Sequence, residues 1–180
     1  MADRTYPVDI NGVHRDLPIV RLSDNLSVAS FVILGDCEVV VAAAEAIKDR
    51  LPEVDYLVTA EAKGISFAHE LSRVLGHPRY IVARKSVKGY MVHPLIVDVT
   101  SITTHGNQML CLDETDAEMI KGRRVLLVDD VISTGASIEA IEKLAEEAGA
   151  IVAGKAAILT EGDPEAHRDV IALGNLPLFD

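Results

Sequence analysis

Two adjacent carboxylates, Asp129 and Asp130, precede a run of small residues at positions 133–137. The apolar segment 125–129 before them has the length of a buried strand, and apolar residues after them recur with helical spacing. Small residues at a helix start offer amides and hydroxyls that can surround a phosphate. Carboxylates beside them can hold sugar hydroxyls or Mg²⁺. The pattern predicts a site for a phosphorylated sugar, with its small residues at Ser133, Thr134, Gly135, Ala136 and Ser137.

Two simpler interpretations of this segment explain less of it. Helix capping needs a single Ser, Thr or Asp, so it leaves one carboxylate and most of the small residues unexplained. An ATPase would need a Gly-x-x-x-x-Gly-Lys-Ser/Thr loop elsewhere in the chain. The nearest sequence, 149–156, ends in Ala156 and comes after a helical pattern instead of a strand. Neither interpretation replaces the sugar phosphate site.

Basic residues gather in one part of an otherwise acidic chain. Residues 62–93 contain six Lys or Arg and one acidic residue, whereas the whole chain has a formal net charge of −11. Such a cluster suits a ligand with several negative charges. Within it, four basic residues follow the ends of predicted strands and are therefore placed to reach a ligand: Lys63, Arg84, Lys85 and Lys88.

Strand-length apolar runs alternate with helical patterns through the middle of the chain. This alternation predicts an α/β fold, a doubly wound, mainly parallel sheet with helices on both faces. Ligands of such sheets bind beyond the carboxyl ends of the strands. The predicted strands are 56–60, 79–83, 125–129 and 151–159, and the predicted helices are 65–75 and 137–148.

Two segments interrupt the alternation. Residues 8–35 hold short apolar pieces without a clear period, and we expect them to form a hood outside the sheet. Residues 86–122 hold two strand-like pieces, 95–100 and 108–112, so a hairpin with its turn at 105–107 is expected, and about 86–110 would form a mobile loop. A long excursion of this kind usually forms a lid or binding loop. With no repeat or linker, residues 1–180 are expected to form one domain.

Composition excludes several other classes of protein. An acidic chain with 28 Asp and Glu against 17 Lys and Arg is a poor partner for nucleic acid or anionic lipid. The longest apolar run, 39–44, is far too short to cross a membrane, so we expect a cytoplasmic protein. Cys37 and Cys111 lack metal-ligand or redox spacing and are expected to act as small apolar residues.

Three segments together resemble a known family. Residues 125–137, VLLVDDVISTGAS, resemble the phosphoribosyl pyrophosphate (PRPP) signature of type I phosphoribosyltransferases. Residues 60–64, AEAKG, resemble the pyrophosphate loop of the adenine phosphoribosyltransferase branch, with Lys63 where Arg is usual. Residues 83–89, ARKSVKG, resemble the start of the mobile catalytic loop of that branch. The resemblance extends from about residue 54 to 160, in the order of the family.

This resemblance implies an activity. Members of the family transfer ribosyl 5-phosphate from Mg²⁺-bound PRPP to a nucleobase and release pyrophosphate. For this chain it implies a purine phosphoribosyltransferase of purine salvage that forms a nucleoside monophosphate, with adenine as the first base to try, and that pairs as a homodimer. A xanthine, hypoxanthine or guanine enzyme is the alternative within the fold. A non-catalytic regulator that senses PRPP is the alternative outside enzymes.

The resemblance also implies roles for individual residues. Lys63, Arg84 and Lys85, with Lys88 and Mg²⁺, would bind the departing pyrophosphate. Asp129 and Asp130 would hold the ribose hydroxyls directly or through the metal, and residues 133–137 would anchor the 5′-phosphate. The pyrophosphate loop consists of Glu61, Ala62, Lys63 and Gly64. Its backbone amides would help to bind the pyrophosphate. A cis peptide bond that does not involve proline is expected within 61–63.

The base-binding side departs from the adenine-specific pattern. That branch ends its mobile loop with Glu-Tyr-Gly, whereas this chain has Thr104-His105-Gly106. His105 could handle the proton near neutral pH or could be an ordinary solvated loop residue. The hood segment 18–24 resembles that of xanthine phosphoribosyltransferases and related regulators, so the base is left open. The residues expected to contact it are Val20, Arg21, Leu22 and Val131.

Overall fold

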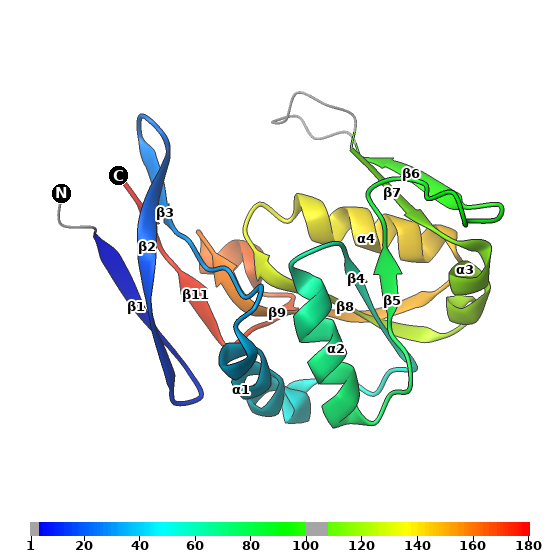
Figure 1. The fold of residues 1–180 in the computed structure, drawn as a ribbon, viewed down its shortest axis with the longest axis horizontal. Helices are drawn as coiled ribbons and strands as arrows, with labels where there is room; N and C mark the ends of the chain where they lie inside the picture. Colours follow the sequence, from blue (N-terminus) through cyan, green and yellow to red (C-terminus); the bar gives the residue numbers. More distant parts are fainter. Residues whose placement is uncertain (1–3, 100–107) are drawn as a thin grey trace.

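A parallel sheet forms the centre of the molecule in the computed structural model, which describes residues 4–99 and 108–180 (Figure 1). Its strand order is β10-β9-β8-β4-β5, and β11 also pairs with β9. Every pairing within this sheet is parallel, which confirms the predicted α/β fold. The strands are β4 (Tyr56–Ala60), β5 (Ile81–Ala83), β8 (Arg124–Ile132), β9 (Ile151–Glu161), β10 (Val170–Ile171) and β11 (Gly174–Leu176).

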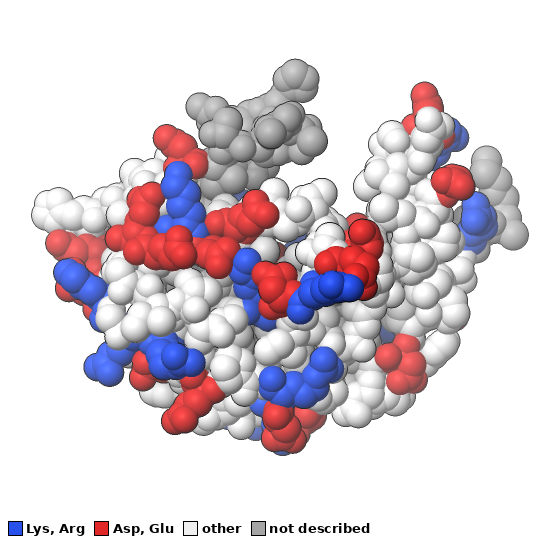
Figure 2. All heavy atoms as spheres, turned by 180° about the vertical axis from the view of Figure 1, so that it is seen from behind, with Lys and Arg blue, Asp and Glu red and all other residues white. Residues whose placement is uncertain are grey.

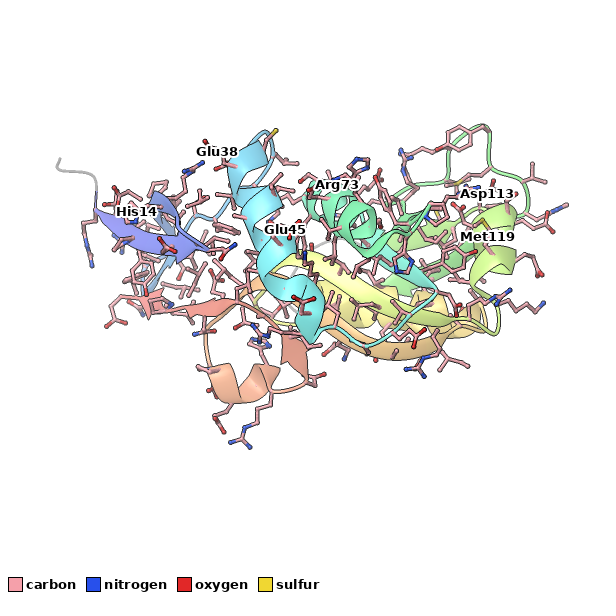
Figure 3. The ribbon with its side chains drawn as sticks, turned by 90° about the horizontal axis from the view of Figure 1, so that it is seen from below. His14, Glu38, Glu45, Arg73, Asp113 and Met119 are labelled. Carbon is pink, nitrogen blue, oxygen red and sulfur yellow. The ribbon has the colours of Figure 1, made fainter. Side chains whose placement is uncertain are left out.

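Helices cover both faces of this sheet. Helices α1 (Cys37–Ile47) and α2 (Gly64–Leu75) lie side by side on one face, where Figure 3 shows Glu45 on α1 near Arg73 on α2. Helix α4 (Ala136–Glu147) packs on the opposite face. Successive residues of a strand point to opposite faces, so Leu57 joins the core under α1 and α2 while Val58 joins the core under α4. The described residues also form two short 3₁₀ helices, η1 (Lys48–Arg50) and η2 (Pro164–His167).

A second, antiparallel sheet lies beside the first and forms the hood (Figure 1). The N-terminal segment supplies β1 (Thr5–Ile10), β2 (Val13–Ser23) and β3 (Leu26–Ala29). The last strand of the chain, β12 (Leu178–Phe179), pairs with β3, and the Phe179 ring meets Tyr6 edge-on at 5.6 Å. The hood is therefore built from both ends of the sequence.

The excursion after β5 contains a hairpin. Strands β6 (Leu95–Val99) and β7 (Gln108–Leu112) pair antiparallel and contact α4, and helix α3 (Glu114–Ile120) follows them. The turn expected at residues 105–107 lies outside the described residues, as does His105. No helix in the described part of the chain is both long and apolar enough to cross a membrane.

The structure corrects the boundaries of three predicted strands, among them β9, which continues to Glu161 instead of ending at residue 159. β8 continues to Ile132, three residues beyond the predicted end, because it keeps its parallel pairing with β9 as far as Thr160. Asp129 and Asp130 therefore lie within the strand, and the turn begins at Ser133. β5 begins at Ile81 instead of residue 79.

Candidate active site

The polar residues singled out in the sequence come together because of the order of the strands. β4 lies between β5 and β8, so the carboxyl ends of these strands are neighbours at one edge of the sheet. The pyrophosphate loop follows β4 at Glu61, and the predicted start of the catalytic loop follows β5 at Arg84. Asp130 lies near the end of β8. Three separate segments thus meet at the edge where parallel sheets bind ligands.

Asp130 is the most deeply buried charge at this edge. It is 1% exposed, and Lys63 Nζ lies 2.9 Å from its Oδ2 atom. That oxygen accepts no well-aligned hydrogen bond, so the ammonium group of Lys63 is its nearest compensation. Lys63 itself is half-exposed, at 50% of its side-chain surface. A buried carboxylate held by a cation that faces solvent can exchange that cation for the hydroxyls or metal of a ligand.

Asp129 lies beside the Asp130–Lys63 ion pair, where its environment disfavours the ionised carboxylate. Its Oδ1 atom accepts from the Asp130 amide at 2.9 Å. Burial, and then the negative charge of Asp130, raise the pKa of Asp129 to about 7. A cation at this position would favour the ionised form of Asp129.

The start of α2 needs a residue without a side chain. A Cβ atom at Gly64 would lie 2.3 Å from Thr59 Oγ1 and 3.0 Å from Asp129 Oδ1. Glycine therefore allows the pyrophosphate loop to approach β8 closely. The peptide between Glu61 and Ala62 is cis, as the family resemblance implied.

The two aspartates suit a Mg²⁺ ion that is shared with a ligand. No group of three or more His, Cys, Asp or Glu residues within 4–99 and 108–180 is arranged to hold a metal by itself. Mg²⁺ often binds through one or two carboxylates and takes its other oxygens from water and substrate phosphates. The orphaned Oδ2 of Asp130 and the raised pKa of Asp129 are consistent with such a shared ion.

The turn after β8 forms a small cup. Gly135, with φ of +84°, is the residue before α4. Because the first amides of any helix have no intrahelical partner, those of α4 can donate to a ligand. A cavity of about 40 Å³ lies there, and its lining includes Val131, Ser133, Thr134 and Ser137. Ser133, Thr134 and Ser137 are exposed, whereas Ala136 is half-buried. Amides and hydroxyls around a helix start are well suited to an anion.

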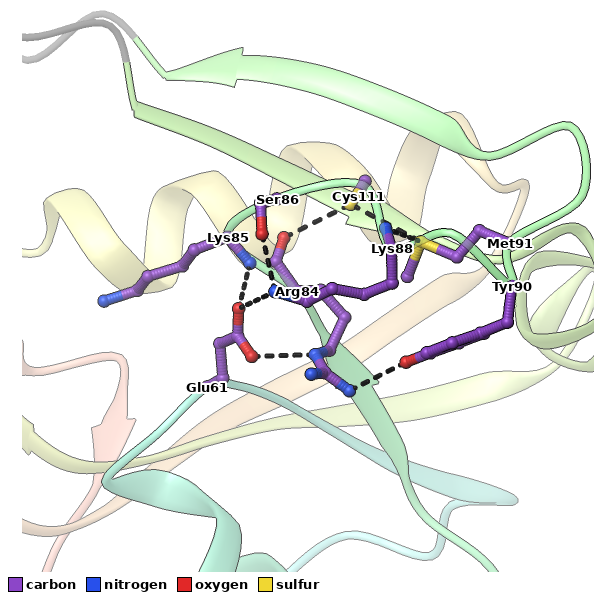
Figure 4. A network of polar contacts seen from close by, with 8 residues as sticks. All are labelled: Glu61, Arg84, Lys85, Ser86, Lys88, Tyr90, Met91 and Cys111. Carbon is purple, nitrogen blue, oxygen red and sulfur yellow. Dashed lines mark hydrogen bonds and ion pairs between the residues drawn. The ribbon is translucent and has the colours of Figure 1, made fainter.

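Glu61 connects the pyrophosphate loop with the segment after β5 (Figure 4). Its carboxylate accepts from Arg84 Nε at 2.7 Å and from the Lys85 amide at 2.6 Å, with Lys88 Nζ at 3.8 Å. Burial alone would raise the pKa of Glu61, but hydrogen bonds from the Lys85 amide and Arg84 lower it below its usual range. The carboxylate is therefore ionised at neutral pH and engaged by its own chain.

A larger cavity of about 640 Å³ separates the hood from the end of β9. Figure 2 shows the surface hollowed between the hood and the rest of the molecule. Leu22 lines this cavity, whereas Val20 and Arg21 are exposed on β2 and the Arg21 side chain donates to Ser23 O and Asp24 O. Several other residues of its lining were not predicted from the sequence, among them Leu26, Val28, Glu161, Asp163 and His167.

Comparison with known proteins agrees with this geometry. The model of the family "Phosphoribosyl transferase domain" matches residues 38–173. A hypoxanthine/guanine phosphoribosyltransferase of Methanocella paludicola is 32% identical over 160 residues, 89% of this chain and 76% of that protein. An adenine phosphoribosyltransferase of Treponema denticola is 30% identical over 134 residues, 74% of this chain and 65% of that protein.

Solved structures show the same fold. The crystal structure of adenine phosphoribosyltransferase from Thermoanaerobacter pseudethanolicus superimposes with a TM-score of 0.64, at 24% identity, over 79% of this chain and 84% of that chain. The chain is thus an α/β protein in which polar residues of three segments meet at the carboxyl ends of parallel strands. The chain belongs to the phosphoribosyl transferase domain family.

Proposed function

We propose that this phosphoribosyltransferase transfers ribosyl 5-phosphate from PRPP to a purine base, and that the products are a nucleoside monophosphate and pyrophosphate in purine salvage. The observation that carries this proposal is the meeting of three segments at one sheet edge. Lys63, after β4, lies 2.9 Å from Asp130 of β8, and Arg84, after β5, lies 2.7 Å from Glu61 of the loop after β4. The small-residue cup follows Asp130 at the same end of β8. PRPP is a sugar with a phosphate at one end and a pyrophosphate at the other, so its negative charges suit the cations and the amides of this site.

The mechanism follows from where charge develops. When pyrophosphate leaves, positive charge spreads over the anomeric carbon and the ring oxygen of the ribose. Lys63, Arg84 and Lys85 would stabilise the departing pyrophosphate, since fixed cations placed where negative charge grows lower the barrier. Bound Mg²⁺ would supply further neutralisation of the phosphates. Asp129 and Asp130 would accept hydrogen bonds from the ribose hydroxyls and place their charge near the developing cation.

The remaining parts of the substrates have separate sites in this proposal. The cup of Ser133, Thr134, Gly135, Ala136 and Ser137 would bind the 5′-phosphate. The purine would enter the cavity below the hood, where Leu22 and Val28 offer apolar surface and Glu161 offers acceptors. Ser133, Thr134 and Gly135 line both the cup and this cavity, so the two regions adjoin, whereas Val131 lines only the cup. Val20 and Arg21 remain candidates for the base only if the hood rearranges when the ligand binds.

The choice of purine is the finer part of the proposal. Adenine is the first base, in agreement with the name of the Treponema denticola relative. Hypoxanthine or guanine is the second choice, because the Methanocella paludicola relative carries that name. The acceptors of Glu161 could pair with the ring and amino N–H groups of guanine or with the amino group of adenine.

The deciding experiment mixes the protein, Mg²⁺ and PRPP with adenine, guanine, hypoxanthine or xanthine in separate reactions. We expect one or more bases to yield nucleotide and pyrophosphate in equal amounts. PRPP binding without turnover of any base would instead support the regulator that senses PRPP. His105→Ala would test proton handling in the same assay, because an unchanged pH profile would remove His105 from the mechanism.

The expected homodimer stays a prediction. Exposed apolar side chains lie at the start of α1 and just before it, and they offer a surface for a second copy: Val32, Leu34 and Val41. Sedimentation of the purified chain would measure its mass in solution.

A further inference from the structure

We propose that Glu61 is a positioning residue that acts through Arg84: its carboxylate fixes the guanidinium group in the orientation that receives the pyrophosphate of PRPP. The inference rests on the proposed function, since it assigns Arg84 to the pyrophosphate. It differs from the role expected of the loop, which used backbone amides around Glu61. The side chain of Glu61 would contact no part of the substrate.

The geometry shows a carboxylate that joins two loops. Glu61 follows β4, whereas Arg84 and Lys85 follow β5, and 23 residues separate Glu61 from Arg84 in sequence. One carboxylate oxygen accepts from Arg84 Nε and the other from the Lys85 amide (Figure 4). The Glu61 side chain is 19% exposed. Because both oxygens are occupied by the chain, the carboxylate has little capacity left for a ligand.

Further contacts hold Arg84 on its other sides. Its backbone pairs with Cys111 of β7 through two hydrogen bonds of 2.9 and 2.8 Å. Its Nη1 atom donates to Tyr90 Oη at 3.0 Å. Among the residues at 4–99 and 108–180, no acceptor is paired with Nη2 of Arg84. The side chain is 34% exposed, so a held guanidinium presents one terminal nitrogen to an incoming anion.

Charge opposes direct contact between the Glu61 carboxylate and the oxygens of pyrophosphate. An ionised carboxylate repels phosphate oxygens, and hydrogen bonds from two donors keep this one ionised. Arg binds phosphate best when its planar fork is already oriented, because less rotamer freedom is lost on binding. Glu61 should therefore strengthen pyrophosphate binding only by holding the guanidinium group of Arg84. Its effect on binding should disappear when Arg84 is replaced.

The test compares binding of Mg²⁺-pyrophosphate by calorimetry in four proteins: wild type, Glu61→Ala, Arg84→Ala and the double variant. We expect Glu61→Ala to weaken binding about tenfold, a coupling within the usual range for residues in contact. In the Arg84→Ala background the same change should have little further effect. Affinity for the nucleoside monophosphate product should be unchanged throughout, since that ligand lacks the pyrophosphate.

Two controls separate positioning from folding. Glu61→Gln keeps an acceptor for the Lys85 amide but offers no carboxylate to Arg84, so it should behave like Glu61→Ala while it preserves the loop. Glu70 forms a similar pair with Arg73 on α2, at 3.0 and 2.7 Å, away from this edge. Glu70→Ala should therefore leave pyrophosphate binding unchanged even if it lowers the melting temperature.

Three results would overturn the inference. Tighter binding by Glu61→Ala would show that the carboxylate competes with the ligand. Equal losses in the wild-type and Arg84→Ala backgrounds would show that Glu61 acts without Arg84. A wild type that binds no pyrophosphate would leave Arg84 without its ligand. Because the readout is binding, a wild type that binds pyrophosphate but transfers to no purine would defeat the proposed function alone.

Discussion

Asp130 combines deep burial with a single cationic neighbour. Its carboxylate lies 2.9 Å from Lys63 Nζ, and burial of a charge is costly unless a partner compensates it. A ligand that brings hydroxyls and a metal would supply that compensation in another form. Within the chain itself the charges of the site are paired, Lys63 with Asp130 and Arg84 with Glu61.

Asp130→Asn tests this residue directly. We expect kcat/KM to fall at least about a hundredfold, roughly 2.7 kcal/mol, because the amide holds ribose hydroxyls and metal less well than the carboxylate. Circular dichroism should show an intact fold, since half-exposed Lys63 can be solvated when its partner is neutral. Asp49→Asn, an exposed aspartate after α1, is the matched control. A variant with near-normal kcat/KM would contradict the role of Asp130.

Part of the site could be predicted from residue types that are adjacent in the sequence, whereas the part that depends on the tertiary fold could not. Asp129, Asp130 and the small residues after them form a local motif, so they can be found without a structure. Glu161 and His167 line the cavity only because the hood folds over the end of β9. Glu161 could have been found from the rule that ligands bind after strands, had the strand been extended to its observed end.

At the scale of elements, alternating strands and helices were predictable, whereas α1 was not. Between Glu38 and Glu45 its run of valines and alanines contains no polar residue, so it does not show the repeating polar positions of an amphipathic helix. Its start is fixed instead by Asp36, whose side chain accepts from the Val39 amide at 3.2 Å. Arg15 of the hood donates to the same carboxylate at 2.8 and 2.9 Å, so one residue caps α1 and ties the hood to it. Figure 3 shows Glu38, a further partner of Arg15, at this end of α1.

The stability of this junction should depend on pH. Hydrogen bonds from Arg15 hold the pKa of Asp36 below its usual range. A carboxyl whose pKa is lowered by folding stabilises the protein above its unfolded pKa, and loses that contribution as pH falls through the folded value. Asp36→Asn should therefore lower the free energy of unfolding by about 1 kcal/mol at pH 7.

Urea unfolding of both proteins at several pH values measures this contribution. The difference should shrink below the usual pKa of aspartate, near 3.8. Asp24→Asn, an exposed hood residue at 3.4 Å from Arg21, should change stability little at any pH. A difference between wild type and Asp36→Asn that persists undiminished in acid would refute the charge-based account.

Across the whole molecule, the acidic surface and the hood determine what reaches the site. Lys and Arg are interspersed with Asp and Glu over the face in Figure 2, in a chain with net charge −11. An anionic ligand must therefore be attracted locally, by the basic residues after β4 and β5. The hood sheet could not be assembled from sequence, because β12 pairs with β3 across about 150 residues.

Removal of residues 177–180 tests the contribution of the C-terminal strand. Without β12, the hood loses a strand and the Tyr6–Phe179 contact, and Leu178 no longer lines the cavity. We expect KM for the purine to rise several-fold while the affinity for PRPP stays the same, because none of the residues proposed to bind PRPP belongs to the hood. Removal of Asp180 alone is the control. An equal loss of PRPP affinity would argue against separate sites.

Binding of PRPP itself tests the central claim most directly. Calorimetric titration with Mg²⁺ and PRPP should show binding to the wild type and at least about hundredfold weaker binding to Thr134→Glu, roughly 2.7 kcal/mol, because the new carboxylate would face the 5′-phosphate. Thr134 is exposed, so the substitution should not disturb folding. Thr115→Glu, at an exposed site on α3, should bind like the wild type. A wild type that does not bind PRPP, or a Thr134→Glu protein that binds it equally well, would contradict the account.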